Sequence, residues 1–388
     1  MGRDLHPSEP VRAQTAHFRR KDVVEDRSVA SPEDIPQRLE RHMRFWRREP
    51  VDAPLLSIQR GDYPWVLHAI RVQAAGDGGL LIHENIGVQD LIAGVEDSYA
   101  KHDLTGHDRF FTAGPPSLNW MEGIVGCPVW VGDESTWSEH PWKDLSQAGS
   151  LKLSPDNKVF HKLLEYTTAL VRQAEGRWPV GQTHQRGPID MVAALIGDAE
   201  LCYALMDEPE NTVMAIERCT DIWLAVAKAQ FDLIPRWHGG YVLNHGGLWT
   251  PGTVTATQID ASALLSPATY ARYVLPQDRR IFASVDYASI HLHSGSMHTA
   301  ELLAQEKHVK AIECALDLPA GPAVADLIPV FRKVLARKPL IVDGPVTFDE
   351  AMLLIEKLPW AGLSLGLRFE NEAEADELTA WAERKGWR

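Results

Sequence analysis

Cysteine is scarce in this sequence and never occurs in the spacing that metal ribbons and disulfide frameworks use. The 388 residues include four cysteines, and no two of them form a Cys-x-x-Cys pair. Small disulfide-rich domains and zinc ribbons depend on such closely spaced cysteines. The sequence therefore argues against both classes and predicts an ordinary globular protein with a hydrophobic core.

Long hydrophobic runs and basic clusters are also missing. No apolar run reaches the roughly 18–20 residues that cross a membrane. The net charge is −14 at pH 7, without the basic stripe that is typical of nucleic-acid binding. The polar N-terminal segment lacks the apolar centre of a signal peptide. We therefore predict a cytoplasmic protein that binds neither membranes nor nucleic acids.

Several common catalytic motifs are absent as well. The chain has no Gly-x-Ser-x-Gly elbow, no His-Glu-x-x-His zinc motif and no Walker loop. No glycine-rich phosphate loop follows the first predicted strand, which argues against a doubly wound dinucleotide-binding sheet. The chemistry must therefore be sought in residues that the fold brings together.

Short apolar runs alternate with longer amphipathic stretches. The predicted strands span residues 53–59, 128–131, 179–183, 240–244, 289–293, 311–315, 339–343 and 362–369. The predicted helices span residues 151–174, 189–205, 209–231, 267–283, 299–305, 323–336, 347–357 and 373–385. Repeated strand–helix units build parallel sheets, and this many in succession favour a (β/α)8 TIM barrel.

The first part of the chain precedes this rhythm. Residues 1–35 are polar and are predicted to form a flexible N-terminal arm. A helix follows up to about residue 48, with Ser31 as its N-terminal cap. We expect a barrel with an N-terminal helical extension, built as a single domain over residues 36–388.

His291 and His293 are the most informative residues of the chain. They come at the end of a predicted strand, where residues two apart project to the same face. Two imidazoles side by side suit either a metal site or an acid–base pair. A catalytic zinc takes three protein ligands, and His298, Glu313, Cys314, Asp317 and His245 are candidates for the third. The metal-free alternative, in which the two histidines orient a substrate, stays open.

Other polar residues cluster where predicted strands end, and a barrel places its active site at those ends. The residues are Gln182, His184, Arg186, Asn244, His245, Glu313, Cys314, Asp317, Asp343 and Arg368. Arg186 precedes Gly187-Pro188, which opens a helix and exposes backbone N–H groups. We predict that His184, His245 and Asp260 act in catalysis, and that Gln182, Arg186, Asn244 and Asp343 bind substrate.

Tryptophan is abundant, with 13 residues, several of them in loops rich in proline and glycine. Trp120 and Trp249 lie beside predicted site residues and are predicted to form the walls of a substrate pocket. The alternative is that both simply pack in the core.

Several ordered segments resemble the uroporphyrinogen decarboxylase superfamily, which includes zinc-dependent methyltransferases acting with corrinoid proteins and thiols. They are residues 46–54, Trp120-Met121-Glu122 with Gly126-Cys127-Pro128, Arg186-Gly187-Pro188, 196–198, 206–209, 265–276 with Asp260 upstream, and 291–295. The resemblance spans roughly residues 40–370 and implies a (β/α)8 barrel.

Departures from the family pattern bear on function. The arginine-rich loop that grips a porphyrinogen has no counterpart here, which argues against a true uroporphyrinogen decarboxylase. The methyltransferase branch holds zinc with His-x-Cys and a later cysteine, but this chain has His293 at the second position and no cysteine near residues 362–368. Imidazole in place of thiolate makes a harder metal site and puts thiol methylation in doubt.

Three functions are therefore carried forward. The first is a methyltransferase or demethylase for a small methylated substrate, with Zn²⁺ or another divalent metal held by residues drawn from His291, His293, His298, Glu313 and Cys314, and with a corrinoid protein as a candidate partner. The second is a metal-free decarboxylase or related lyase for a small carboxylate, in which Arg186 binds the carboxylate. The third is a non-catalytic barrel that binds a ligand or a corrinoid protein. A monomer or homodimer is expected for each.

Overall fold

Residues 34–60, 79–96, 98–99, 108–132, 135–244 and 246–387 are described by the computed structural model. The predicted N-terminal arm lies outside these ranges, except for its last two residues. Seven strands form one parallel sheet in the order β1-β12-β11-β10-β9-β8-β5. They are β1 (Leu55–Arg60), β5 (Gln185–Arg186), β8 (Val254–Gln258), β9 (Tyr287–His293), β10 (Val309–Ala315), β11 (Leu340–Pro345) and β12 (Leu363–Phe369).

Segment 108–113 closes this sheet into a ring. The Asp108 N–H donates a hydrogen bond to the Leu56 carbonyl on β1, and Ala113 forms a parallel bridge with Val180 just before β5. The first and last strands also pair, with Leu55 opposite Ser364. The protein is therefore a (β/α)8 barrel, as the strand–helix rhythm predicted.

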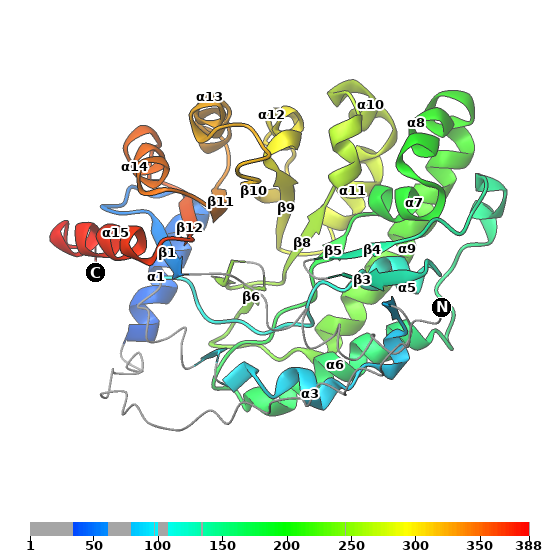
Figure 1. The fold of residues 1–388 in the computed structure, drawn as a ribbon, viewed down its shortest axis with the longest axis horizontal. Helices are drawn as coiled ribbons and strands as arrows, with labels where there is room; N and C mark the ends of the chain where they lie inside the picture. The colour runs from blue at the N-terminus through cyan, green and yellow to red at the C-terminus, as the bar shows by residue number, and fades with distance from the viewer. Residues whose placement is uncertain are drawn as a thin grey trace, which may run out of the picture.

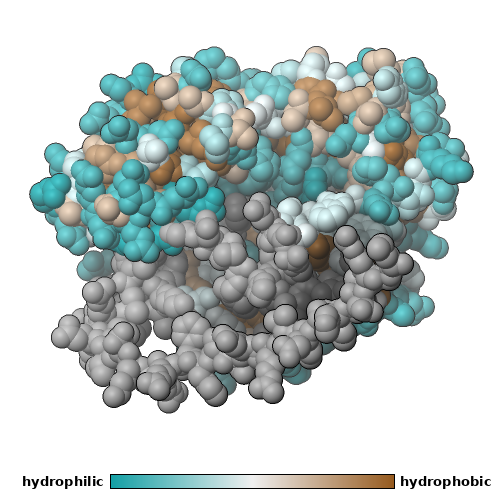
Figure 2. Space-filling model, viewed as in Figure 1, coloured by the Kyte–Doolittle hydropathy of each residue, from teal (hydrophilic) through white to brown (hydrophobic). Residues whose placement is uncertain are grey.

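Helices form the outer layer (Figure 1). They are α1 (Asp34–Arg47), α3 (Val88–Ile92), α5 (Trp120–Ile124), α6 (Lys158–Ala174), α7 (Pro188–Ile196), α8 (Asp198–Asp207), α9 (Pro209–Leu233), α10 (Pro267–Tyr273), α11 (Leu275–Phe282), α12 (Ala300–Leu303), α13 (Val324–Leu335), α14 (Phe348–Lys357) and α15 (Glu372–Arg384). Short 3₁₀ helices span His83–Asn85, Leu145–Ser150, Asp260–Leu264 and Ser294–Thr299. On the face shown in Figure 2, hydrophilic residues surround scattered hydrophobic ones. No helix in the described ranges is long and apolar enough to cross a membrane.

Two predicted strands lie outside the barrel sheet. The segment predicted at 128–131 is β3 (Val129–Val131), which pairs antiparallel with β2 (Leu80–Leu81) and β4 (Thr136–Ser138). The segment predicted at 240–244 is β6 (Tyr241–Leu243), which forms an antiparallel hairpin with β7 (Leu248–Thr250). The barrel strand that follows, β8, was missed, because its Thr-rich sequence lacks a strong apolar run.

Two predicted helices are each broken in the structure. The helix predicted at 189–205 ends at Gly197, whose φ of 102° permits the turn from α7 into α8. The helix predicted at 267–283 is divided at Val274, just before Pro276, into α10 and α11.

The β6–β7 hairpin fills the amino-terminal end of the barrel. Leu243 and Leu248 pack with Val254, Leu55 and Ile341, which lie near the beginnings of three barrel strands. Helix α1 adds Phe45 and Trp46 to the same cluster, and the Trp46 indole N–H donates to the Trp249 carbonyl at 2.8 Å. We call this part, made by α1, the hairpin and the strand beginnings, the floor.

Glycines allow the hairpin to approach the barrel wall closely. A Cβ on Gly247 would lie 2.1 Å from the Phe110 carbonyl oxygen, and Gly247 has a φ of 59°. At the hairpin tip, Asn244 fits against Gly114 and Gly181, where a Cβ would lie 2.4–2.5 Å from Asn244 side-chain atoms. The floor thus fills the amino-terminal end of the barrel, at the other end from the carboxyl ends of its strands.

Candidate active site

Four neighbouring strands aim polar side chains into the barrel at the same level. In the parallel register Arg186 lies opposite Gln258, Gln258 opposite His291, and His291 opposite Glu313. Residues opposite each other on adjacent strands point to the same face of a sheet. These side chains therefore form one row near the carboxyl ends of β5, β8, β9 and β10, which we call the mouth together with the loops above it.

His293 and Asp317 form a dyad at the mouth. His293 ends β9, and its Nδ1 lies 2.7 Å from the Asp317 Oδ1. Ser294 donates its backbone N–H and its hydroxyl to the other carboxylate oxygen, at 3.1 and 2.7 Å. Burial alone would raise the pKa of Asp317, but the hydrogen bonds from His293 and Ser294 lower it on balance. An ionised Asp317 fixes the Nδ1–H tautomer of His293.

The other nitrogen of His293 faces a second carboxylate. Its Nε2 lies 3.7 Å from the Asp260 Oδ1, a separation too long for a direct hydrogen bond. The Gln258 side-chain amide donates to the Asp260 Oδ2. The His293 side chain is 43% exposed, so its Nε2 is accessible to a ligand at the mouth.

Arg186 is surrounded by carboxyl groups. Its guanidinium lies 3.2 Å from the Glu122 Oε1 and 3.4 Å from the Asp260 Oδ2. Burial opposes the charge of Arg186, but Asp190, Glu122 and Asp260 raise its pKa on balance. Asp190 lies in the first turn of α7, and its Oδ1 accepts the Ala261 backbone N–H at 2.8 Å.

Glu122 and Asp190 are fully buried, and burial shifts the pKa values of both carboxyl groups in the same direction. It raises the pKa of Glu122, against the lowering effect of the Arg186 charge and the hydrogen bond from Asn119. It also raises the pKa of Asp190, assisted by the negative charge of Asp260. Each carboxyl has one oxygen without a hydrogen-bond partner, Glu122 Oε2 and Asp190 Oδ2.

His184 and His291 lie deeper, beside Glu313. Their rings meet edge-on with centroids 4.9 Å apart, and His291 and His293 are similarly arranged at 5.1 Å. The His291 Nδ1 is 3.2 Å from the Glu313 Oε1, and Glu313 is fully buried. The predicted side-by-side projection of His291 and His293 is present, and His184 joins them.

A further ion pair joins Asp343, a predicted site residue, to Arg109, which the sequence analysis did not predict. The Arg109 guanidinium lies 2.6 Å from the Asp343 Oδ1, and its Nε donates to the Ser364 hydroxyl at 3.0 Å. A Cβ on Gly366 would lie 2.2 Å from both charged groups, so only glycine leaves room for them. Arg109 could not be predicted, because its segment has no recognisable strand pattern.

Other predicted site residues lie elsewhere. Gln182 donates its amide to the Ala227 carbonyl on α9, outside the barrel interior. Trp120 and Trp249 are buried, and their indole N–H groups bond the Pro116 and Trp237 carbonyls. Both are packing residues, and Trp249 belongs to the floor. Asn244 is at the hairpin tip, and His245 lies outside the described residues.

Two of the predicted metal ligands lie apart from His291, His293 and Glu313. Cys314 alternates with Glu313 on β10, so it points outward and is fully buried in the core cluster beneath the helices. His298 is exposed and its Nε2 bonds the Leu265 carbonyl at 3.0 Å. Among the described residues, no group of three or more His, Cys, Asp and Glu side chains is arranged to hold a metal ion. The described donors therefore do not form a zinc site, and His245, a candidate third ligand, lies outside the described residues.

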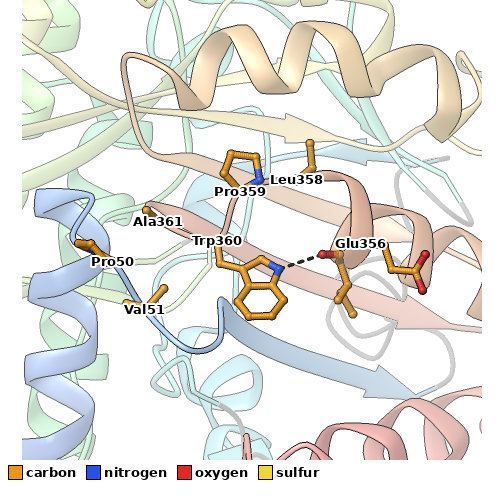
Figure 3. Close-up of a pocket in the computed structure, with 8 residues that line it drawn as sticks. Pro50, Val51, Glu356, Leu358, Pro359, Trp360 and Ala361 are labelled. Atoms are coloured by element: carbon orange, nitrogen blue, oxygen red, sulfur yellow. Dashed lines mark hydrogen bonds between the residues drawn. The ribbon is translucent and has the colours of Figure 1, made fainter.

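A pocket at the amino-terminal end of the barrel, opposite the mouth, has few side chains that could take part in catalysis. It has a volume of about 390 Å³ and lies before the beginnings of β1 and β12. Its lining residues are Pro50, Val51, Ile355, Glu356, Leu358, Pro359, Trp360 and Ala361. Trp360 occupies the centre of this view and donates its indole N–H to the Ile355 carbonyl (Figure 3). The titratable side chain of this group is Glu356 alone, so the mouth remains the candidate active site.

Comparison with known proteins supports the fold. No family model and no curated protein matches the chain. The structure is similar to a methyltransferase from Methanosarcina mazei, with a TM-score of 0.57 and 14% identity over 88% of this chain and 99% of that one. The two proteins share a fold. A B12-independent methionine synthase from Shewanella sp. W3-18-1 matches less well, with a TM-score of 0.47 and 11% identity over 86% of this chain and 99% of that one.

Proposed function

We propose that this chain is a methyltransferase-like enzyme that removes a methyl group from a small methylated substrate at the mouth of the barrel. The observation that carries the proposal is the dyad of His293 and Asp317, which presents an oriented imidazole at the carboxyl ends of the strands. The fold shared with a methyltransferase supports the same reaction class.

His293 supplies the acid–base chemistry of the proposed reaction. A methyl acceptor with an X–H group, such as a thiol, places its proton toward the His293 Nε2. As the new X–C bond forms, the proton passes to Nε2, and the electron pair of the broken bond stays with the leaving group. Asp317 stabilises the resulting imidazolium through Nδ1–H. His184 and His291 line the deeper part of the site.

A metal has no step in this proposal, because the described donors do not form a ligand set. A corrinoid protein remains part of the proposal only as a partner to be tried in the assay. Elemental analysis of untagged protein, beside a variant with alanine at both His291 and His293, tests metal binding directly.

A decarboxylase is less well supported. Such an enzyme needs a cation available for the substrate carboxylate, and Arg186 already contacts Glu122 and Asp260. A non-catalytic barrel would give no reason for Asp317 to orient the exposed His293. Release of CO2 from small carboxylic acids, or no turnover at all, would favour one of these alternatives.

The test is a methyl-transfer assay with ¹³C-methyl substrates and a thiol acceptor, followed by NMR. We expect His293→Gln to lower the rate by about 10²–10⁴-fold, because general acid–base catalysis contributes that much. The control is His298→Gln, since His298 is exposed and bonds only a backbone carbonyl outside the site. Equal rates for His293→Gln and wild type would refute the assigned role.

A further inference from the structure

We infer that the methyl donor is a cation, in which the methyl group is attached to a positively charged nitrogen or sulfur. This inference rests on the proposed function and adds the substrate class. It is carried by the charges of the mouth, by their burial and by the charge balance of the reaction.

Carboxyl groups outnumber cations among the described residues of the mouth. The carboxyl groups are Glu122, Asp190, Asp260, Glu313, Asp317 and Asp343, and burial drives Glu122 and Asp190 toward their neutral forms. The guanidinium groups are Arg109, Arg186 and Arg368, the last at the carboxyl end of β12, two residues after the inward-facing Gly366. Arg109 already has a carboxylate neighbour in Asp343, and Arg186 has Glu122 and Asp260. A site of this composition attracts a cation and repels an anion.

Buried carboxyl oxygens next to Arg186 provide a second observation. Glu122 and Asp190 are both fully buried, and each has an oxygen without a hydrogen-bond partner. The Asp260 Oδ1, which faces the His293 Nε2, also lacks a hydrogen bond. An onium group has no N–H or S–H to donate, so it would interact with these oxygens through its positive charge, first with the Asp260 Oδ1 beside the exposed His293.

With a cationic donor the reaction creates no new pair of opposite charges in the site. In an onium compound the C–N or C–S bond breaks, its electron pair stays on the heteroatom, and a neutral amine or sulfide leaves. The acceptor loses its proton to the His293 Nε2 as its bond to the methyl carbon forms. One positive charge thus moves from the substrate to His293, within reach of Asp260 and Asp317.

A neutral methyl ether or thioether would behave differently. Its leaving group would depart as an alkoxide or thiolate, and the carboxylates around the mouth would oppose that negative charge. The same carboxylates that favour an onium donor therefore disfavour a neutral one.

Ligands of matched shape and different charge test this inference. Isothermal titration calorimetry on the full-length protein compares choline with its neutral isostere 3,3-dimethylbutan-1-ol and its anionic relative 3,3-dimethylbutanoate, and includes tetramethylammonium and trimethylsulfonium. We expect at least one onium probe to bind about tenfold more tightly than the neutral isostere, and the affinity to fall as salt is added. The anion should not bind.

Variants locate the binding. Asp260→Asn and Asp317→Asn should each weaken the onium probe by about tenfold. Glu356→Gln, on the opposite side of the barrel, removes one negative charge as a matched control and should leave binding unchanged. Circular dichroism of each variant checks that it is folded, and two separate aspartates keep the test valid if one variant fails to fold.

The outcomes separate this inference from the proposed function. Equal or tighter binding of the neutral isostere, or no onium binding at about 10 mM probe, would overturn the inference. Methyl transfer from neutral donors but not from onium donors would also overturn it and leave the proposed function intact. Selective onium binding without methyl transfer to any acceptor would support the cation site and count against the proposed function.

Discussion

The mouth and the floor of this barrel are built on the two ends of the same strands, yet they bury opposite kinds of side chain. Strand β9 shows the contrast by itself. At its beginning Tyr287 packs edge-on against Trp46 of the floor, with ring centroids 5.2 Å apart. At its end His293 bonds Asp317 in the mouth. The barrel thus concentrates apolar packing at one end and charge at the other.

Each region also contains a buried ionisable group that burial drives toward its neutral form. In the floor, the His42 Nδ1 accepts the Trp249 backbone N–H and its Nε2 bonds the Asp108 carbonyl. In the mouth, Asp190 is held by the Ala261 backbone N–H. Because one group is a base and the other an acid, the two regions should respond to pH in opposite directions.

One of the two largest effects is expected in the floor at low pH. Burial, with the nearby charges of Arg38, Arg41 and Arg109, lowers the pKa of His42 to about 3. The unfolded chain binds this proton near pH 6.5 and the folded chain does not. The free energy of unfolding should therefore fall as the pH drops from 6.5 toward 3, by up to about 5 kcal/mol. Urea unfolding across this range should show a shallower loss in His42→Gln, and parallel curves would contradict the assignment.

An effect of comparable size and opposite direction is expected in the mouth. The raised pKa of Asp190 means that the folded chain keeps a proton that the unfolded chain releases near pH 4. The free energy of unfolding should therefore decrease as the pH rises from 4 to about 8, by up to about 6 kcal/mol. Asp190→Asn keeps the acceptor for Ala261 and should flatten this dependence. A variant with the wild-type slope would exclude Asp190 as its source.

The next effect tests the packing of the floor without touching the mouth. Leu248 is fully buried among the strand beginnings, so Leu248→Ala should lower the free energy of unfolding by about 3 kcal/mol. Leu264→Ala is the matched control, since Leu264 is 55% exposed and should cost less than about 0.5 kcal/mol. Equal losses in thermal or urea unfolding would mean that the hairpin is not part of the core.

The smallest effect concerns Cys314, which lies at the level of the mouth but on the outside of the strand. Cys314→Ala should cost about 1 kcal/mol of stability, because a small buried side chain is shortened. Methyl transfer and metal content should not change. A folded variant that has lost activity would restore Cys314 as a ligand or catalytic group.

The regular part of the barrel was predictable because its hydrophobic periodicity and its amino-acid composition indicate the same secondary structure. The strands β9 to β12 are formed by buried, largely apolar runs, and a helix comes after each of them. The hairpin strand β6 has the same local character but pairs antiparallel with β7, a choice made by packing in the floor. Strand β8 is buried on both sides despite three polar residues, and no local sequence pattern predicts that burial.

The site was predictable where a residue's strand was predictable. His291 and His293 project together because strand periodicity alone decides their direction, and the same rule places Cys314 outward once Glu313 faces inward. Gln182 breaks the rule, because residues 181–184 are irregular and its amide reaches α9. Asp190 and Arg109 enter the site through contacts distant in sequence, Ala261 and Asp343, which a single sequence does not reveal.

The pairing of the first strand with the last has a consequence for how the chain reaches this structure. Leu55 finds its partner only at Ser364, so the ring cannot close while the protein is still being synthesised. Until then the inner faces of β1 and its neighbours stay exposed on the nascent chain. Such a long-range closing contact predicts slow folding, with the open barrel as an aggregation-prone species that chaperones would protect.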